Sequence, residues 1–165
     1  MRLCIIGHAR HGKDTVAKLI NKHYFLKFKS SSEAASEIFI YDALKDKYNY
    51  KTPIECFEDR INHRKEWHDL ICEYNSKTPY RLAKNVLKNN DVYVGMWSDI
   101  ELITCKNLNI FDFIIGVYDN RKPEESKKSF NIDFWNQCDV IIPNCGTLEE
   151  LEERAIKLFN NLKFK

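Results

Sequence analysis

Residues 7–15 read GHARHGKDT, and this stretch constrains the fold more than any other part of the chain. The phosphate-binding P-loop has the pattern G-x-x-x-x-G-K-[S/T], and residues 7–13 fit it up to the lysine. Asp14 then stands where the pattern has a hydroxyl residue, and Thr15 follows one position later. Such a loop belongs between a buried strand and a helix, and both patterns flank it: RLCII before and KDTVAKLI after. We therefore predict a phosphate loop after the first strand of an α/β domain.

The residue types of this loop suit a phosphate ligand. Gly7 and Gly12 let the backbone curl so that successive N–H groups point inward, and the following helix adds partial positive charge at its start. Lys13 supplies a mobile ammonium group, which at a helix start opposes the helix dipole and so indicates an anionic partner rather than an ordinary surface lysine. We expect phosphate groups to contact the whole loop: Gly7, His8, Ala9, Arg10, His11, Gly12, Lys13, Asp14 and Thr15.

Asp14 has two interpretations. It is either an acid at a helix start that the helix dipole stabilises, or a carboxylate that meets a magnesium ion through water, because a bare carboxylate would be repelled by a triphosphate. Thr15, on the first helical turn, either donates its hydroxyl group to a phosphate or bonds its own backbone. The sequence leaves both pairs of interpretations open.

Apolar runs alternate with helical patterns along the rest of the chain. Five runs have the length and composition of buried strands. They cover residues 2–6, 25–30, 92–96, 111–118 and 139–142. Strands that alternate with helices form a parallel sheet covered on both faces, so we predict a three-layer αβα domain with five parallel strands. With 165 residues, one domain is expected.

Capping residues mark the expected helix starts. Thr52-Pro53-Ile54-Glu55 has the form of a capping box with proline at the first helical position. Thr78-Pro79 is expected to start a further helix, and Ser98-x-x-Glu101 and Thr147-x-x-Glu150 to cap two more. Residues 119–133, DNRKPEESKKSFNID, break the alternation because they are polar and charged, and we interpret them as a mobile flap over the site.

Composition and charge narrow the partners. The net charge is only +2, from 26 basic and 24 acidic side chains, so long duplex DNA is not implied, whereas a local site for a small anion is compatible with this balance. The six cysteines include no C-x-x-C pair and their spacing fits no zinc site, so we expect reduced thiols. The first apolar run, LCII, is too short for a signal peptide or a membrane helix, and we expect a cytoplasmic protein.

Four segments resemble the phage deoxynucleoside monophosphate kinases and their short phage relatives, within the P-loop nucleotide kinases. They are GHARHGKDTVA (7–17), CFEDRINHRKEW (56–67), YVGMWSDIEL (93–102) and DVIIPNCGTLEEL (139–151), and the likeness extends over nearly the whole chain. The second segment is the most specific, and the last is shared with dephospho-coenzyme A kinases. In such kinases a Gly-Lys-Asp-Thr ending of the loop is normal, with the threonine touching a nucleotide phosphate.

The resemblance implies transfer of a phosphoryl group to a nucleotide phosphate, with ATP and Mg²⁺ as cofactors. It implies a helical segment, here about residues 32–88, that closes over the acceptor, and a lid, here about residues 119–133, that carries an arginine. We assign this role to Arg121, because closure of a flap excludes water and brings positive charge to the transferring group. The loop after the last strand would lie against the adenine base, through Asn144, Gly146 and Thr147.

Arg60 and Arg64 are four residues apart, so on a helix they share one face. Two guanidinium groups on one face can grip a phosphate by paired donors, and we assign them to the phosphate of the acceptor nucleotide. The alternative is a solvated face on which Glu58, Asp59 and Glu66 neutralise them.

The stretch after the third predicted strand holds further candidates. Asp99 is a candidate to hold the water ligands of Mg²⁺ or to orient the acceptor, whereas Glu101 is better explained as part of a helix capping box. Relatives have an arginine, able to hold a phosphate, where this chain has Trp97. Trp97 either stacks on a base or packs as a core aromatic.

The expected function is conversion of a deoxynucleoside monophosphate to the diphosphate for phage DNA synthesis, by a monomer or homodimer in the host cytoplasm. Only small nucleotides are expected as partners, with no membrane. One alternative is a kinase that acts on dephospho-coenzyme A or on a modified base within DNA, although the balanced charge disfavours DNA. Another is a nucleotide-binding module that has lost catalysis, which Trp97 favours and the intact Gly12-Lys13 and Thr15 oppose.

No general base is required for the expected reaction, because the acceptor oxygen is already anionic and catalysis consists of positioning and charge neutralisation. The side chains assigned to this work are Lys13, Arg60, Arg64 and Arg121.

Overall fold

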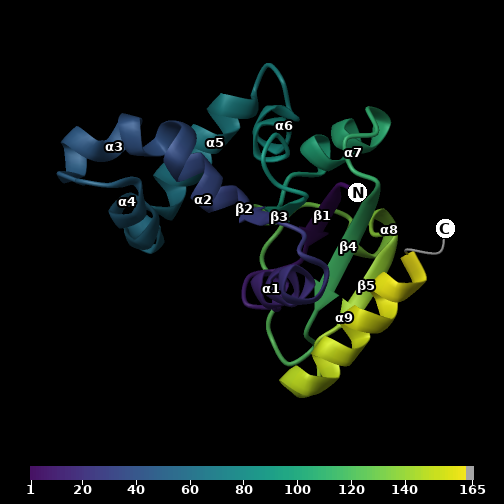
Figure 1. Ribbon diagram of the computed structural model, residues 1–165. Coiled ribbons are helices and arrows are strands. Elements are labelled where there is room, and N and C mark those ends of the chain that lie inside the picture. Colours follow the sequence, from purple (N-terminus) through teal and green to yellow (C-terminus); the bar gives the residue numbers. More distant parts are fainter. Residues whose placement is uncertain (163–165) are drawn as a thin grey trace.

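The computed structural model describes residues 1–162 of the chain, and within them five parallel strands form one sheet (Figure 1). The strands are β1 (Leu3–Ile6), β2 (Phe28–Ser30), β3 (Val92–Met96), β4 (Phe113–Tyr118) and β5 (Val140–Pro143). Their order across the sheet is β2-β3-β1-β4-β5, so the strand that leads into the predicted phosphate loop is the central one. The prediction of five parallel strands is confirmed, with boundaries that differ by up to three residues.

Helices cover both faces of this sheet, as predicted. The helices α1 (Lys13–Tyr24) and α9 (Leu148–Leu162) lie on one face. The helices α6 (Arg81–Val86), α7 (Asp99–Asn107) and the short α8 (Phe134–Gln137) lie on the other face. Within residues 1–162, no helix is both long enough and apolar enough to cross a lipid bilayer.

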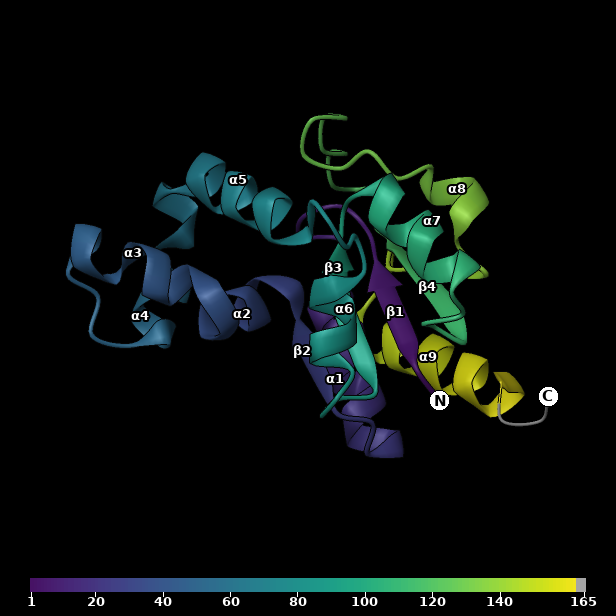
Figure 2. The same cartoon turned by 90° about the horizontal axis from the view of Figure 1, so that it is seen from above.

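The segment between β2 and α6 forms a helical arm, residues 31–75, that projects from the sheet (Figure 2). Its elements are α2 (Ser31–Ala35), a π-helical turn (Ser36–Ile40), α3 (Tyr41–Tyr48), α4 (Pro53–Asp59), a 3₁₀ turn (Arg60–Asn62) and α5 (Arg64–Asn75). The arm therefore supplies most of the helical segment that the sequence assigns to the acceptor.

The side chains of β1 divide the core into two parts, because successive residues of a strand point to opposite faces. Leu3 and Ile5 belong to the apolar cluster under α1 and α9, whereas Cys4 and Ile6 belong to the cluster under α6, α7 and the arm. All four are fully buried, as expected for the central strand of a parallel sheet. In α9, Phe159 is also fully buried, and burial of such a side chain contributes about 1.5–3 kcal/mol.

A β-bulge interrupts β3 near its carboxyl end. The pairing of β1 with β3 passes from Ile5 opposite Val94 to Ile6 opposite Met96, so Gly95 is an extra residue in β3. Because of this extra residue, Met96 packs in the same cluster as Tyr93 instead of facing α1. The bulge thereby sets the direction in which the chain leaves the sheet toward Trp97.

Three of the four predicted helix starts are confirmed. Thr52 Oγ1 accepts the N–H of Glu55 (3.2 Å), and Ser98 Oγ accepts the N–H of Glu101 (3.5 Å). Thr147 and Glu150 form a reciprocal capping box at α9, in which each side chain accepts the other's N–H (3.3 and 3.1 Å). The prediction for Thr78-Pro79 was wrong in position: Arg81 N donates to Thr78 O (2.9 Å), so these residues form a turn and α6 begins at Arg81.

Candidate phosphate and acceptor site

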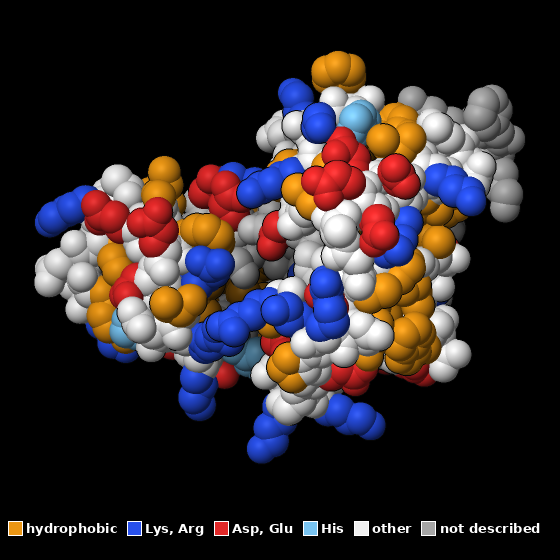
Figure 3. Space-filling view, turned by 90° about the horizontal axis from the view of Figure 1, so that it is seen from below, with side chains coloured by type: hydrophobic (Ala, Val, Ile, Leu, Met, Phe, Trp, Pro, Cys, Tyr) orange, Lys and Arg blue, Asp and Glu red, His pale blue; other side chains and the backbone are white. Residues whose placement is uncertain are grey.

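The predicted site residues gather at the carboxyl ends of the central strands. The loop of residues 7–12 joins β1 to α1, and the segments after β3 and β4 leave the sheet on either side of it (Figure 2). In open parallel sheets this edge is where ligands bind. Seen from below, the surface is hollowed where the arm meets the sheet, and Lys and Arg side chains gather beside the hollow (Figure 3).

Both glycines of the loop are required because other parts of the chain approach them closely. Gly7 has a φ of 152° and Gly12 a φ of 100°. A Cβ atom at Gly7 would lie 2.4 Å from the backbone O of Val117, and one at Gly12 would lie 2.4 Å from Nδ2 of Asn144. These contacts and angles exclude other residues without rearrangement. Arg10 lies exposed in the loop with a left-handed φ of 67°.

Lys13 is the first residue of α1, and its ammonium group folds back onto the loop that precedes the helix. Nζ donates a hydrogen bond to the backbone O of His8 (2.8 Å). Burial lowers the pKa of Lys13, and the nearby carboxylates of Asp14 and Glu125 oppose this shift. A cation held among the loop atoms is available to a phosphate oxygen, as the P-loop pattern predicts.

Two histidines of the loop bind the segment that follows β4. His8 Nδ1 accepts the N–H of Glu125 (3.0 Å), and His11 Nδ1 accepts the N–H of Asp119 (3.1 Å). Because Nδ1 of His11 is an acceptor, Nε2 carries the proton and donates to Pro123 O (3.2 Å). Burial lowers the pKa of His8, which favours the neutral ring that this pattern needs. The side chains of both histidines thus hold the predicted lid, and the assignment of these loop residues to phosphate stays a prediction.

A carboxylate lies on the phosphate loop itself. Glu125 Oε2 accepts the backbone N–H of Ala9 (2.6 Å). Its neighbour Glu124 accepts the hydroxyl of Tyr118 (3.1 Å) and approaches His8 Nε2 to 4.0 Å. Sequence reasoning on the lid considered its basic residues and missed both acids. The letters KPEES place two acids beside a proline, but nothing local reveals that one of them reaches the loop.

Arg121 is engaged with the loop after β5 rather than with the phosphate loop. Its guanidinium donates to both carboxylate oxygens of Asp119 (2.8 and 2.9 Å), to Asn144 O (2.8 Å) and to Gly146 O (3.3 Å). These hydrogen bonds lower the pKa of the buried Asp119 to about 2. Asn144 in turn donates to His11 O (3.1 Å). The predicted catalytic arginine thus braces the segment 144–146, and a direct role for it in transfer stays a prediction.

Arg60 and Arg64 do not lie on one continuous helix, and this part of the prediction was wrong. The helix breaks at His63 (φ −128°, ψ 30°), which leaves Arg60 in the 3₁₀ turn and Arg64 at the first position of α5. The guanidinium of Arg60 stacks on the ring of Phe57 at 3.8 Å and donates to Phe57 O (2.7 Å). Burial lowers the pKa of Arg60, Asp14 opposes the shift and Arg64 adds to it. Arg60 is therefore within electrostatic range of both Asp14, at the start of α1, and Arg64.

The acids proposed as neutralising partners of the arginines are largely occupied elsewhere. Asp59 binds His63 Nε2 (3.0 Å), and His63 packs on the ring of Tyr48 at 4.0 Å. Glu66 accepts from Lys47 and from Tyr48, both at 2.7 Å. This pairing disfavours the interpretation of Arg60 and Arg64 as part of a neutralised, solvated face.

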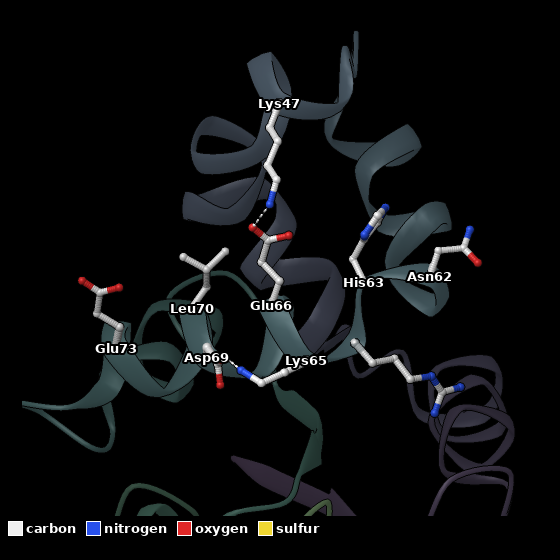
Figure 4. Close-up of a pocket in the computed structure, with 9 residues that line it drawn as sticks. Lys47, Asn62, His63, Lys65, Glu66, Asp69, Leu70 and Glu73 are labelled. Carbon is white, nitrogen blue, oxygen red and sulfur yellow. Dashed lines mark hydrogen bonds and ion pairs between the residues drawn. The ribbon is translucent and has the colours of Figure 1, made fainter.

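Figure 4 shows a pocket of about 500 Å³ in the arm, between the end of α3 and α5. The salt bridges Lys47–Glu66 and Lys65–Asp69 cross it, each at 2.7 Å. Among its lining residues Arg64 belongs to the candidate site, and none belongs to the phosphate loop. Since most of its charges are paired with one another, we do not assign a ligand to this pocket.

The segment after β3 contributes an aromatic pair. The rings of Trp97 and of His68 on α5 lie 4.5 Å apart, tilted by 34°. Trp97 is half-buried and packs on the core cluster below it. Among residues 1–162, two buried side-chain atoms lack a hydrogen-bond partner, and they come from the same two segments: Trp67 Nε1 and Asp99 Oδ1. Buried polar atoms without a partner are uncommon in folded proteins.

For magnesium, the described residues offer no ready cage. No group of three or more His, Cys, Asp or Glu side chains within residues 1–162 is arranged to hold a metal ion. Asp14 is exposed at the start of α1, and Asp99 begins α7 with its N–H on Asn131 Oδ1 (2.8 Å). Contacts of these two carboxylates with Mg²⁺ through water stay a prediction.

The side chain of Glu101 does not lie where a capping box would place it. Its N–H bonds to Ser98, but its side chain is 6% exposed and Oε1 accepts from Asn75 Nδ2 (2.8 Å). Burial raises the pKa of Glu101 to about 7. The same Asn75 accepts the N–H of Leu82 (3.2 Å), so this buried pair links α7 to α5 and α6 behind the site.

Several solved kinase structures have a similar fold. A dephospho-CoA kinase from Campylobacter jejuni matches with a TM-score of 0.52 and 14% identity, over 97% of this chain and 96% of that chain. Shikimate kinases from Bacteroides thetaiotaomicron (TM-score 0.51, 12% identity, 99% and 98% covered) and Aquifex aeolicus (0.50, 14%, 99% of each) also match. At these identities the likeness establishes the fold alone, which this chain shares with those kinases. No protein-family model matches the sequence, and no curated protein matches it.

Proposed function

We propose that the protein is an ATP-dependent kinase that converts a deoxynucleoside monophosphate to the diphosphate. One observation carries this proposal: Asp14 and Arg64 both act electrostatically on Arg60. Arg60 of the arm is thus within electrostatic range of Asp14, at the start of α1, and of Arg64. An acceptor that carries its own phosphate suits this pair of arginines, because two guanidinium groups favour a dianionic group.

On the donor side, the chain's own groups bind and neutralise. The backbone N–H groups of residues 7–12 and the start of α1 receive phosphate oxygens, and Lys13 exchanges its bond to His8 O for the transferring group. Thr15 on the first turn adds a hydroxyl group. Asn144 and Gly146, held by Arg121, border the place expected for the adenine. Bound Mg²⁺ would supply further neutralisation of phosphate charge, with Asp14 and Asp99 as its candidate partners through water.

On the acceptor side, aromatic rings accompany the arginines. The pair of Trp97 and His68 offers a flat surface that suits a nucleobase, and base–aromatic stacking is worth about 1–3 kcal/mol. Trp97 cannot hold a phosphate as the arginine of relatives does, so phosphate binding is left to Arg60 and Arg64. Transfer then needs the two substrates aligned and their charge neutralised, without a general base.

The alternatives keep the same donor site. Dephospho-coenzyme A or a modified base in DNA would replace the mononucleotide as acceptor, and a binding module without catalysis would retain only the nucleotide. The arginine pair favours a phosphate-bearing acceptor over a neutral one. The sequence resemblance to phage kinases supports a role in DNA-precursor supply in the cytoplasm of a phage-infected cell as part of this proposal.

The test is an acceptor panel. The protein is incubated with Mg-ATP and, separately, each deoxynucleoside monophosphate, dephospho-coenzyme A and single-stranded DNA, and ADP release is measured. We expect turnover with one or more deoxynucleoside monophosphates and background rates with the other acceptors. ATP binding without turnover on any acceptor would support the inactive module instead.

A further inference from the structure

We propose that Glu125 is an internal anion that occupies the phosphate loop, and that a triphosphate must displace it to bind. The inference rests on the proposed function in so far as residues 7–13 are taken to bind phosphate. It goes beyond that function because it assigns the lid acid a competing role at the same N–H groups.

The contact has the chemistry of phosphate binding. Glu125 Oε2 accepts the N–H of Ala9, in the middle of the loop, at 2.6 Å. This is a charge-assisted hydrogen bond between a carboxylate and a backbone N–H of the kind that loops of this type offer to phosphate oxygens. The negative charge of Glu125 also acts on Lys13, the cation of the loop. A phosphate oxygen and this carboxylate would therefore compete for the same positive potential.

The rest of the segment is fastened so that the carboxylate stays in place. His8 and His11 accept the N–H groups of Glu125 and Asp119, and His11 also donates to Pro123 O. Beyond these bonds, the ring of Phe130 packs on His8 at 4.5 Å and is itself 4% exposed. The two side chains that hold the segment belong to the phosphate loop, so closure of the lid and occupation of the loop are one event.

The consequence is a lower apparent affinity for every ligand that needs the open loop. When a binding-competent state is populated only in part, the apparent dissociation constant rises by the inverse of that fraction. A ligand that gains little from the loop does not displace the carboxylate, whereas a triphosphate that gains more opens the segment.

The test compares nucleotide binding in matched variants. The dissociation constant of ATP is measured by calorimetry, without acceptor, for the full chain and for the variants Glu125→Ala, Glu125→Gln and Glu124→Gln. We expect Glu125→Ala to bind ATP about tenfold more tightly, as for a loop closed about nine-tenths of the time, and Glu125→Gln to fall between. Glu124→Gln removes an adjacent charge that hydrogen-bonds Tyr118 and comes no nearer to the loop than 4.0 Å, at His8 Nε2, so it should change the constant less than about twofold.

A second measurement detects the hydrogen bond between Glu125 and the Ala9 N–H in the absence of a ligand. Hydrogen exchange at the Ala9 amide should accelerate in Glu125→Ala and stay unchanged in Glu124→Gln, because only the former loses the acceptor of that N–H. Equal ATP affinity of Glu125→Ala and the unmodified chain, with binding lost in Lys13→Ala, overturns the internal anion and leaves the proposed phosphate loop standing. No ATP binding by any of these proteins overturns both.

Discussion

The ammonium group of Lys13 donates a 2.8 Å hydrogen bond to the backbone carbonyl of His8 in the same loop. Replacing Lys13 by alanine removes the mobile cation that would follow the transferring phosphoryl group. We expect turnover with Mg-ATP and acceptor to fall on the order of 10²–10³-fold, the size of effect seen when one electrostatic donor is removed from a catalytic site. The measurement is kcat at saturating substrates, with circular dichroism to confirm the fold.

Lys18→Ala is the matched control, since Lys18 is an exposed lysine further along α1. It should leave kcat within about twofold. A Lys13→Ala protein that keeps most of its activity would show that residues 7–13 are not a working phosphate loop.

Arg60→Ala and Arg64→Ala test the acceptor side. Each substitution removes one of two guanidinium groups that are within electrostatic range of each other. Arg60 is also within range of Asp14. We expect the KM for the acceptor to rise about tenfold or more in each variant, while the KM for ATP changes little, because a hydrogen bond to a charged group is worth about 1.5–3 kcal/mol. Steady-state kinetics with each substrate varied in turn gives both constants.

Lys65→Ala is the control for these arginines. Lys65 follows Arg64 directly, but its side chain is 91% exposed and bonds Asp69 (2.7 Å). Its loss should not alter either KM. If Arg60→Ala and Arg64→Ala raised both KM values equally, their assignment to the acceptor phosphate would be wrong.

Trp97 is expected to bind the acceptor base together with His68. Trp97→Ala should raise the KM for the acceptor by about fivefold to a hundredfold, the range that base stacking on an aromatic ring provides. Trp97→Phe keeps an aromatic face and should restore most of the affinity. If both variants keep the normal KM, Trp97 is a packing residue, and a loss of folding stability in Trp97→Ala alone would point the same way.

Glu101 makes the stability of the fold depend on pH. Its pKa is about 7 in the folded protein, because of burial, and about 4.3 in an unfolded chain. A group whose folded pKa is raised stabilises the fold fully below the unfolded value and loses that contribution as the pH rises through the folded value. The free energy of unfolding should therefore fall between about pH 4.5 and pH 7, on the order of 3 kcal/mol from this group.

Glu101→Gln keeps an acceptor for Asn75 and cannot ionise. Urea unfolding at pH 5 and pH 8 should find this variant as stable as the unmodified chain at the lower pH and more stable at the higher. Glu73→Gln, an exposed residue on α5, serves as control and should leave the pH dependence intact. An unchanged slope in Glu101→Gln would mean that Glu101 is ionised in the folded protein.

Much of the fold could be predicted from the sequence, because the residue patterns that specify its strands and helix starts are local. The strands are short apolar runs between helical patterns, and caps such as Thr52 and Thr147 bond N–H groups only three residues away. Gly7 and Gly12 were identified from their spacing, and the structure adds that both approach other parts of the chain closely.

The sequence did not reveal features that depend on distant contacts. The break at His63 follows the 3₁₀ turn, within a stretch whose spacing resembles one helix. Glu101 fits a capping box by its spacing, yet its side chain turns inward because Asn75 on α5 offers a donor. Glu125 lies 116 residues from Ala9 in the sequence, so no local pattern could pair them.

Direct identification of the product tests the central claim most directly. ATP labelled in its γ-phosphoryl group is incubated with the protein, magnesium and the deoxynucleoside monophosphate that performs best in the panel, and the products are separated. We expect label in the deoxynucleoside diphosphate, in equal amount to the ADP formed, and about 10²–10³-fold slower formation of it with Lys13→Ala. Label that appears only as inorganic phosphate, or on no product while ATP remains bound, would contradict this claim.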